Sequence, residues 1–180
     1  REILEHGHEI GCHGYKQNTS SRQYENIEGG TSRIIKLLKV TPVGFRAHHF
    51  KIDAEILKVL IKLGYKYDSS IVSPSSIFSK RHFRNTPKAP YHPDLNNIYT
   101  EGDSPILEIP ISALPIVNLP LALSYIKLCG LRLYGAFLSH TKQRVCSIYL
   151  HPYDLFPLPS GVVKVPFYFG MAQKVEDGLQ

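Results

Sequence analysis

The chain has 180 residues, of which 43% are hydrophobic and 20% charged, so it can bury a core and is most simply one domain over residues 1–180. The formal net charge is +6, but the basic residues are spread along helix-like segments, which argues against a nucleic-acid partner. Residues 109–126 carry no charge, yet three prolines interrupt them, so a membrane-spanning helix is not expected.

The cysteines indicate a reducing environment. Cys12, Cys129 and Cys146 are odd in number and show no metal-ligand spacing, which predicts buried free thiols and a cytoplasmic location. The chain begins at Arg1, inside the helix-like stretch REILEHGHEI, so we expect the natural N-terminus to lie further upstream. The sequence does not indicate an oligomeric state.

Short apolar runs alternate with helical patterns along the chain. In chain order, the pattern predicts a strand at 9–12, a helix at 31–40, a strand at 43–45, a helix at 53–63, and strands at 65–67, 106–109 and 145–150. Asp53 is the predicted N-cap of the second helix, and Gly64 is its stop signal. Strand and helix in alternation predict an α/β fold with parallel pairing, either an open sheet or a barrel.

Two segments fall outside this alternation. Residues 72–104 are rich in Ser, Pro, Asn and His, which predicts a long surface loop of the kind that serves as a lid or binding loop. The stretch GVVKVPFYFG, residues 161–170, is either a last strand or a segment that covers the end of a barrel.

Residues of ligating or ionisable type follow four of the predicted strands: His13, Arg46, Asp68 and His151. In parallel α/β folds, the carboxyl ends of the strands meet at one face, where ligands and catalytic groups gather. Each residue alone is more simply a structural or turn residue. Their joint position predicts a functional site.

The motifs HEIGCHGYKQ, GFRAHHF, GYKYDSSI, LEIPIS and IYLHPYDL occur in this order over residues 1–157. Together they resemble the polysaccharide deacetylases with a NodB homology domain, a carbohydrate esterase family of metal-dependent hydrolases. The resemblance implies a deformed (β/α) barrel, here missing its first strand. It also implies that a divalent metal, usually zinc, is held by an aspartate and two histidines spaced H-x-x-x-H, and that an acetylated carbohydrate is the substrate.

The resemblance assigns roles to individual residues. His13 matches the first histidine ligand, and Gln17 stands at the position of the second. Arg46 matches the arginine that orients a catalytic aspartate, and His151 matches the general acid that protonates the leaving amine. Asp68 matches the strand-end aspartate that organises the pocket.

The chain departs from the family pattern at three places. Gln17 offers an amide oxygen where zinc prefers an imidazole, and nothing before His13 supplies the family's aspartate pair. His48 and His49 follow Arg-Ala, where proline is common. One of these histidines could replace the ligand lost at Gln17, so His13, Gln17 and His48 are the predicted metal-contacting residues.

Two explanations remain for these departures. In the simpler one, the chain is part of a longer hydrolase of non-peptide carbon–nitrogen bonds, a deacetylase, and is inactive by itself. In the other, it is a degenerate member that binds a glycan without cleaving it. Tyr91, Tyr99 and Tyr153 are candidates to stack on sugar rings. A small cyclic amide is a third type of substrate, which the polar loop disfavours.

Overall fold

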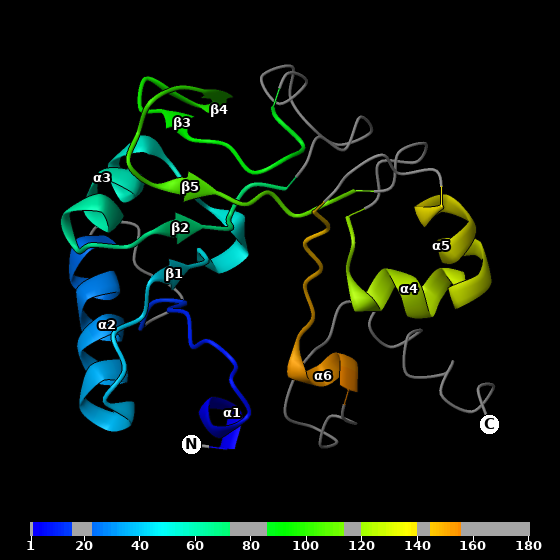
Figure 1. The fold of residues 1–180 in the computed structure, drawn as a ribbon, viewed down its shortest axis with the longest axis horizontal. Coiled ribbons are helices and arrows are strands. Elements are labelled where there is room, and N and C mark those ends of the chain that lie inside the picture. The colour runs from blue at the N-terminus through cyan, green and yellow to red at the C-terminus, as the bar shows by residue number, and fades with distance from the viewer. Residues whose placement is uncertain (1, 16–22, 73–85, 114–119, 140–144, 156–180) are drawn as a thin grey trace.

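The computed structural model describes residues 2–15, 23–72, 86–113, 120–139 and 145–155 and shows a mixed α/β fold (Figure 1). Its centre is a parallel sheet of three short strands, β1 (Gly44–Phe45), β2 (Tyr67–Asp68) and β5 (Leu107–Glu108), in the order β1-β2-β5. This confirms the predicted parallel pairing. Closure into a barrel and a missing first strand remain predictions.

The register of the sheet places the strand ends in one row. Phe45 lies opposite Asp68, and Asp68 lies opposite Glu108. The segment at Cys12 joins this row on the other side of β1 through a parallel bridge to Phe45. The Cys12 amide donates to the Gly44 carbonyl at 2.8 Å, and the Arg46 amide donates to the Cys12 carbonyl at 3.0 Å. The chain therefore leaves Cys12, Phe45, Asp68 and Glu108 at the same edge.

Helices α2 (Gln23–Leu38) and α3 (Ala54–Lys62) lie together on one side of the strands (Figure 1). Helix α2 begins eight residues before the predicted start at residue 31, because its first turns are mostly polar and show little periodicity. Ile27 in those turns is nonetheless fully buried. Tertiary packing therefore outweighs the weak local pattern there.

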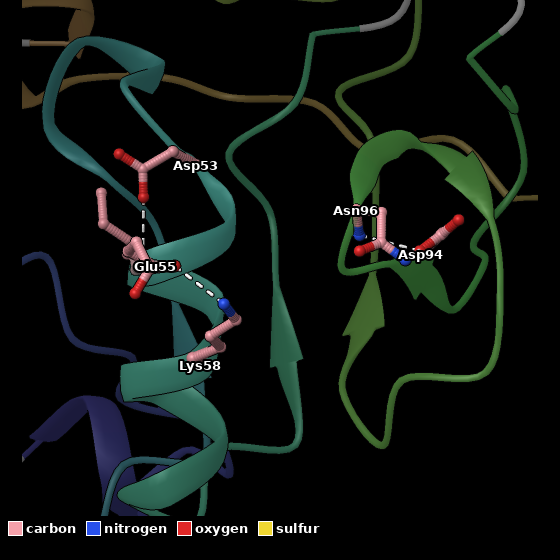
Figure 2. Close-up of polar contacts among 6 residues, drawn as sticks. Asp53, Glu55, Lys58, Asp94 and Asn96 are labelled. Carbon is pink, nitrogen blue, oxygen red and sulfur yellow. Dashed lines mark hydrogen bonds and ion pairs between the residues drawn. The ribbon is translucent and has the colours of Figure 1, made fainter.

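Helix α3 matches its prediction closely. The Asp53 carboxylate accepts a hydrogen bond from the Ile56 amide at 2.8 Å, and Glu55 pairs with Lys58 on the exposed face (Figure 2). Gly64, just beyond the helix, has a φ of +84°. The buried stripe of the helix, Ile56, Leu57 and Leu60, joins the main core. The other buried members of that core are Cys12, Ile27, Phe45, Ala47, Ile52, Tyr65, Ile71, Tyr91, Ile98 and Ile106.

The second part of the predicted 72–104 loop is not structureless. It contains an antiparallel hairpin of β3 (Pro93–Asp94) and β4 (Asn97–Glu101). The Asp94 carboxylate accepts the Asn96 amide at 2.8 Å and so closes the turn (Figure 2). The hairpin was missed because its strands are largely polar, so they lack the apolar alternation of a typical strand. Residues 73–85 lie outside the described residues.

The remaining elements are short. They are α1 (Glu2–Glu5), the 3-10 turn η1 (His48–Phe50), α4 (Leu123–Cys129), α5 (Leu131–Leu138) and α6 (Pro152–Leu155). Helices α4 and α5 lie at the opposite end of the molecule from α2 and α3 (Figure 1). The predicted strand 145–150 is reduced to a parallel bridge between Ala122 and Tyr149. The segment 161–170 lies outside the described residues.

The thiols differ in exposure. Cys12 is buried and free as expected, but Cys146 is exposed, so the prediction of burial is wrong for Cys146. Its neighbours Val145 and Ile148 are apolar in sequence, yet they too are exposed. The side chain of Cys129 lies outside the described ones. Among the helices that the structure describes, none is long and apolar enough to cross a bilayer.

The N-cap of α3 makes a direct test of the fold. Replacing Asp53 with Ala leaves the Ile56 amide without its acceptor, and we expect the free energy of unfolding to fall by about 1 kcal/mol. Asp53→Asn should retain most of the stability. Urea unfolding measures both. As a matched control, Lys58→Ala removes only an exposed ion pair and should change stability by less than about 0.5 kcal/mol.

Candidate functional site

His13 and His48 come together where the Cys12 segment and β1 end. Their ring centroids are 3.9 Å apart, with a tilt of 48° between the ring planes. His13 Nδ1 lies 2.6 Å from the carbonyl oxygen of Arg46. Because a carbonyl oxygen only accepts, Nδ1 carries the proton, and in the neutral ring Nε2 keeps its lone pair. Gly14, with a φ of +82°, turns the chain away directly after His13.

The η1 turn that carries His48 has an unusual backbone. His49 and Phe50 both have a φ of 55°, which is the left-handed region that non-glycine residues rarely adopt. Such strain persists where neighbouring structure holds it, and it is common at functional sites. Burial lowers the pKa of His48, and the neighbouring His13 and His49 lower it further. His48 is therefore favoured as a neutral imidazole.

His151 reaches the same region from the far part of the chain. The Phe50 ring contacts the Tyr149 ring at a centroid distance of 5.3 Å, and Tyr149 contacts His151 at 5.7 Å. Burial lowers the pKa of His151, Asp154 raises it, and the charges of His13 and Arg46 lower it again. The electrostatic influence of His13 and Arg46 on His151 is consistent with a shared site.

Asp154 holds His151 and was missed in the sequence analysis. Its carboxylate is 2% exposed, accepts the His151 amide at 2.7 Å and the Ser124 hydroxyl at 2.6 Å, and lies 3.8 Å from His151 Nδ1. The sequence signal was HPYD: proline at the first position of a helix and an acid at the third, which reaches back to the residue before the helix.

Arg46 follows β1 and is anchored on the next strand end. Its Nε donates to the Ser69 carbonyl at 2.8 Å, and its terminal nitrogen donates to the Ser69 hydroxyl at 2.7 Å. The Ser69 hydroxyl in turn donates to the Ile109 carbonyl at 2.7 Å. Burial lowers the pKa of Arg46, whereas Asp68 and Glu108 raise it. The guanidinium therefore links β1, the end of β2 and the end of β5.

The other predicted site residues are placed differently. Asp68 is fully buried, so it does not reach a substrate, although its position suits the predicted role in organising the pocket. Tyr91 is 3% exposed, and its hydroxyl donates to the Ile98 carbonyl at 2.7 Å, so its ring is not available for stacking on a sugar. Gln17 and the side chain of Tyr153 lie outside the described residues.

The described residues do not form a complete metal centre. A catalytic zinc site needs three protein ligands, and no group of three or more His, Cys, Asp or Glu side chains with suitable geometry occurs in the described ranges. His13 and His48 provide two imidazoles, but their rings lie against one another. The donor set seen here therefore does not fit the zinc site that the sequence resemblance implies.

The comparisons with known proteins support the fold. No family model matches the chain, and no curated protein matches it. The structure is similar to the crystal structure of a proposed polysaccharide deacetylase from Mycobacterium smegmatis, with a TM-score of 0.51 and 20% sequence identity. The match covers 77% of this chain and 48% of that protein, so this chain spans about half the length of its structural relative. At this identity the likeness shows a shared fold.

The Asp154–His151 contact predicts a measurable effect. Asp154→Asn removes the negative charge that raises the pKa of His151, so we expect that pKa to fall further below its usual value. Titration of the imidazole C–H signals by NMR measures the change. Asp103→Asn, an exposed substitution, should leave the titration of His151 unchanged. An unaltered His151 titration in Asp154→Asn would contradict the assigned contact.

Proposed function

We propose that the chain supplies the proton-transferring residues of a polysaccharide deacetylase-like hydrolase. This hydrolase removes acetyl groups from an N- or O-acetylated sugar. One observation supports this most strongly. His13 and His48 contact one another at the carboxyl ends of parallel strands beside an anchored Arg46, and the ring contacts of Phe50 with Tyr149 and of Tyr149 with His151 connect His151 to the η1 turn. The fold shared with a proposed polysaccharide deacetylase is consistent with the proposal.

In this proposal His151 is the general acid. Hydrolysis of an acetamide adds water across the carbon–nitrogen bond: the oxygen of water ends in acetate, and the departing nitrogen takes a proton. His151 gives that proton, and Asp154 keeps the imidazole in position through its contacts with the His151 amide and ring. Arg46 fixes the His13 ring through its carbonyl oxygen. These roles use only contacts among the described residues.

The rings that would meet a sugar are those beside His151. Tyr149 and Phe50 are half-buried and pack edge to face near the imidazoles. They replace Tyr91, which is buried, as the proposed substrate-contacting residues. Aromatic faces suit the apolar face of a sugar ring.

We also propose that the chain binds a divalent metal, zinc. The described residues supply only part of the ligand set for it. The fixed Nδ1–H of His13 favours its Nε2 as a ligand, and a neutral His48 favours a second imidazole. Two imidazoles fall short of the three protein ligands that zinc requires, so we expect the chain to bind zinc weakly, with well under one ion per chain, and His48→Ala to lower that content further.

Elemental analysis of the purified chain measures the zinc. His49→Ala is the matched control, because His49 is exposed and adjacent, and it should leave zinc content unchanged. Equal zinc in the wild type and His48→Ala would exclude His48 as a ligand.

A glycan-binding module without catalysis is the second candidate. It is favoured by the absence of a three-ligand group from the described residues. A single assay distinguishes the two functions. A binding module retains an acetylated oligosaccharide without releasing acetate, whereas the hydrolase releases acetate from it.

Acetate release from acetylated oligosaccharides by the full-length protein tests the hydrolase, since the chain alone is expected to be inactive. We expect His151→Asn to lower the rate by about 10²–10⁴-fold, the usual contribution of a general acid. Since an acid must be protonated, the rate should fall as the pH rises through the pKa of His151, and Asp154→Asn should move this fall to lower pH. His92→Asn is the control, since His92 binds the Ser104 carbonyl elsewhere in the fold. Undiminished release by His151→Asn would exclude the assigned role.

A further inference from the structure

Asp68 and Glu108 form a buried pair beneath the candidate site. They lie opposite one another on the adjacent strands β2 and β5, and both are fully buried. Asp68 Oδ1 accepts the Ser70 hydroxyl at 2.6 Å, and Glu108 Oε1 accepts the Ile71 amide at 2.9 Å. Their second oxygens, Asp68 Oδ2 and Glu108 Oε2, find no donor in the described part of the chain, and the paired positions on adjacent parallel strands put both side chains on the same face of the sheet.

Two ionised carboxylates in this position would be strongly unfavourable. Both have lost their water, and at this separation their charges repel in a medium of low dielectric constant. The adjacent cation, Arg46, directs its Nε–H and one terminal N–H to Ser69, and neither second oxygen accepts a hydrogen bond from it. A single proton between those oxygens removes the repulsion and gives both a partner.

We propose that Asp68 and Glu108 share one proton at neutral pH and, as a carboxylic acid–carboxylate pair, hold the ends of β2 and β5 together under the site. This inference goes beyond the proposed deacetylase activity and does not depend on it. Burial raises the pKa of both groups, and the charge of Asp68 and the hydrogen bond between the two raise the pKa of Glu108 further. Those directions agree with the geometry.

The pair positions groups of the site without touching a substrate. Ser70 donates to Asp68 and accepts the Ala47 amide at 2.8 Å, so Asp68 fixes the chain that follows Arg46. Glu108 fixes the Ile71 amide on the same short segment, which also carries the anchor of Arg46. Asp68 and Glu108 are therefore positioning residues for Arg46.

The groups around the pair keep one charge state near neutral pH. Arg46 faces it from the end of β1, and guanidinium groups remain protonated in proteins. Tyr91 faces both carboxyls and Tyr99 faces Glu108 from the hairpin side, and burial raises the pKa of each phenol. Any titration of the buried cluster between about pH 5 and 8 therefore belongs to the pair.

The shared proton has a defined effect on stability. Above the pKa of an unfolded carboxyl, about 4, the unfolded chain has lost this proton and the native chain retains it. The stabilisation is therefore complete below about pH 4 and is lost as the pH rises through the raised pKa of the pair. In that interval the unfolding equilibrium constant should rise by up to about tenfold per pH unit from this pair.

Infrared spectroscopy of the full chain tests the proposal directly. With ¹³C-labelled Asp and Glu carboxyls, we expect the carbonyl band of a protonated carboxylic acid at neutral pH. Glu108→Gln and Asp68→Asn should both abolish it, whereas the exposed Glu101→Gln should not change it. Absence of the band from the wild type, or its survival in both buried variants, would overturn the proposal.

Urea unfolding as a function of pH gives the second readout. The amide of Glu108→Gln can donate to Asp68 as the acid does, so this variant should fold and lose the tenfold-per-unit dependence, while Glu108→Ala should lose most of its stability. An identical pH dependence in Glu108→Gln and wild type would also overturn the proposal. If Glu108→Gln does not fold, the band in the wild type decides alone.

Discussion

The parallel register of β1, β2 and β5 is the constraint on which the site depends. It places Phe45, Asp68 and Glu108 in one row, with Cys12 bridged to Phe45 at the end. Each residue that follows this row emerges at the same edge of the sheet. A shift by one residue would turn every side chain to the opposite face and separate Arg46 from Ser69. The core beneath the strands fixes this register.

Burying polar groups at this edge of the sheet costs free energy, and the hydrogen bonds of those groups offset the cost. Arg46, Asp68 and Glu108 are all drawn out of water: Arg46 and Glu108 find partners at the end of the neighbouring β2, and Asp68 finds Ser70 two residues further along its own segment. Removing one partner leaves a buried polar group without its hydrogen bond, which is more costly than losing an exposed pair. The η1 turn adds backbone strain at His49 and Phe50, held by the contact of Phe50 with Tyr149. Rigidity and function therefore depend on the same contacts.

Much of this arrangement was predictable from local patterns, and the rest depended on tertiary contacts. Apolar runs predicted the three paired strands, and the Asp53 cap predicted α3, because both signals are local. Because ligands and catalytic groups gather at the carboxyl ends of parallel strands, the sequence predicted that His13, Arg46 and His151 lie near one site. Glu108 was missed because an acid inside an apolar run gives no sign of its partner across the sheet. The burial of Tyr91 depends on its pairing with Glu108, which lies 17 residues away in sequence.

The central claim is that His13, His48 and His151 belong to one carbohydrate site. NMR with ¹³C-labelled histidine, during titration with an acetylated oligosaccharide, tests it most directly. The account predicts that these three imidazoles shift together with a single dissociation constant, while His6, His8 and His92, which lie outside the site, do not respond. Shifts confined to the second group, or no shift at saturating oligosaccharide, would contradict the claim.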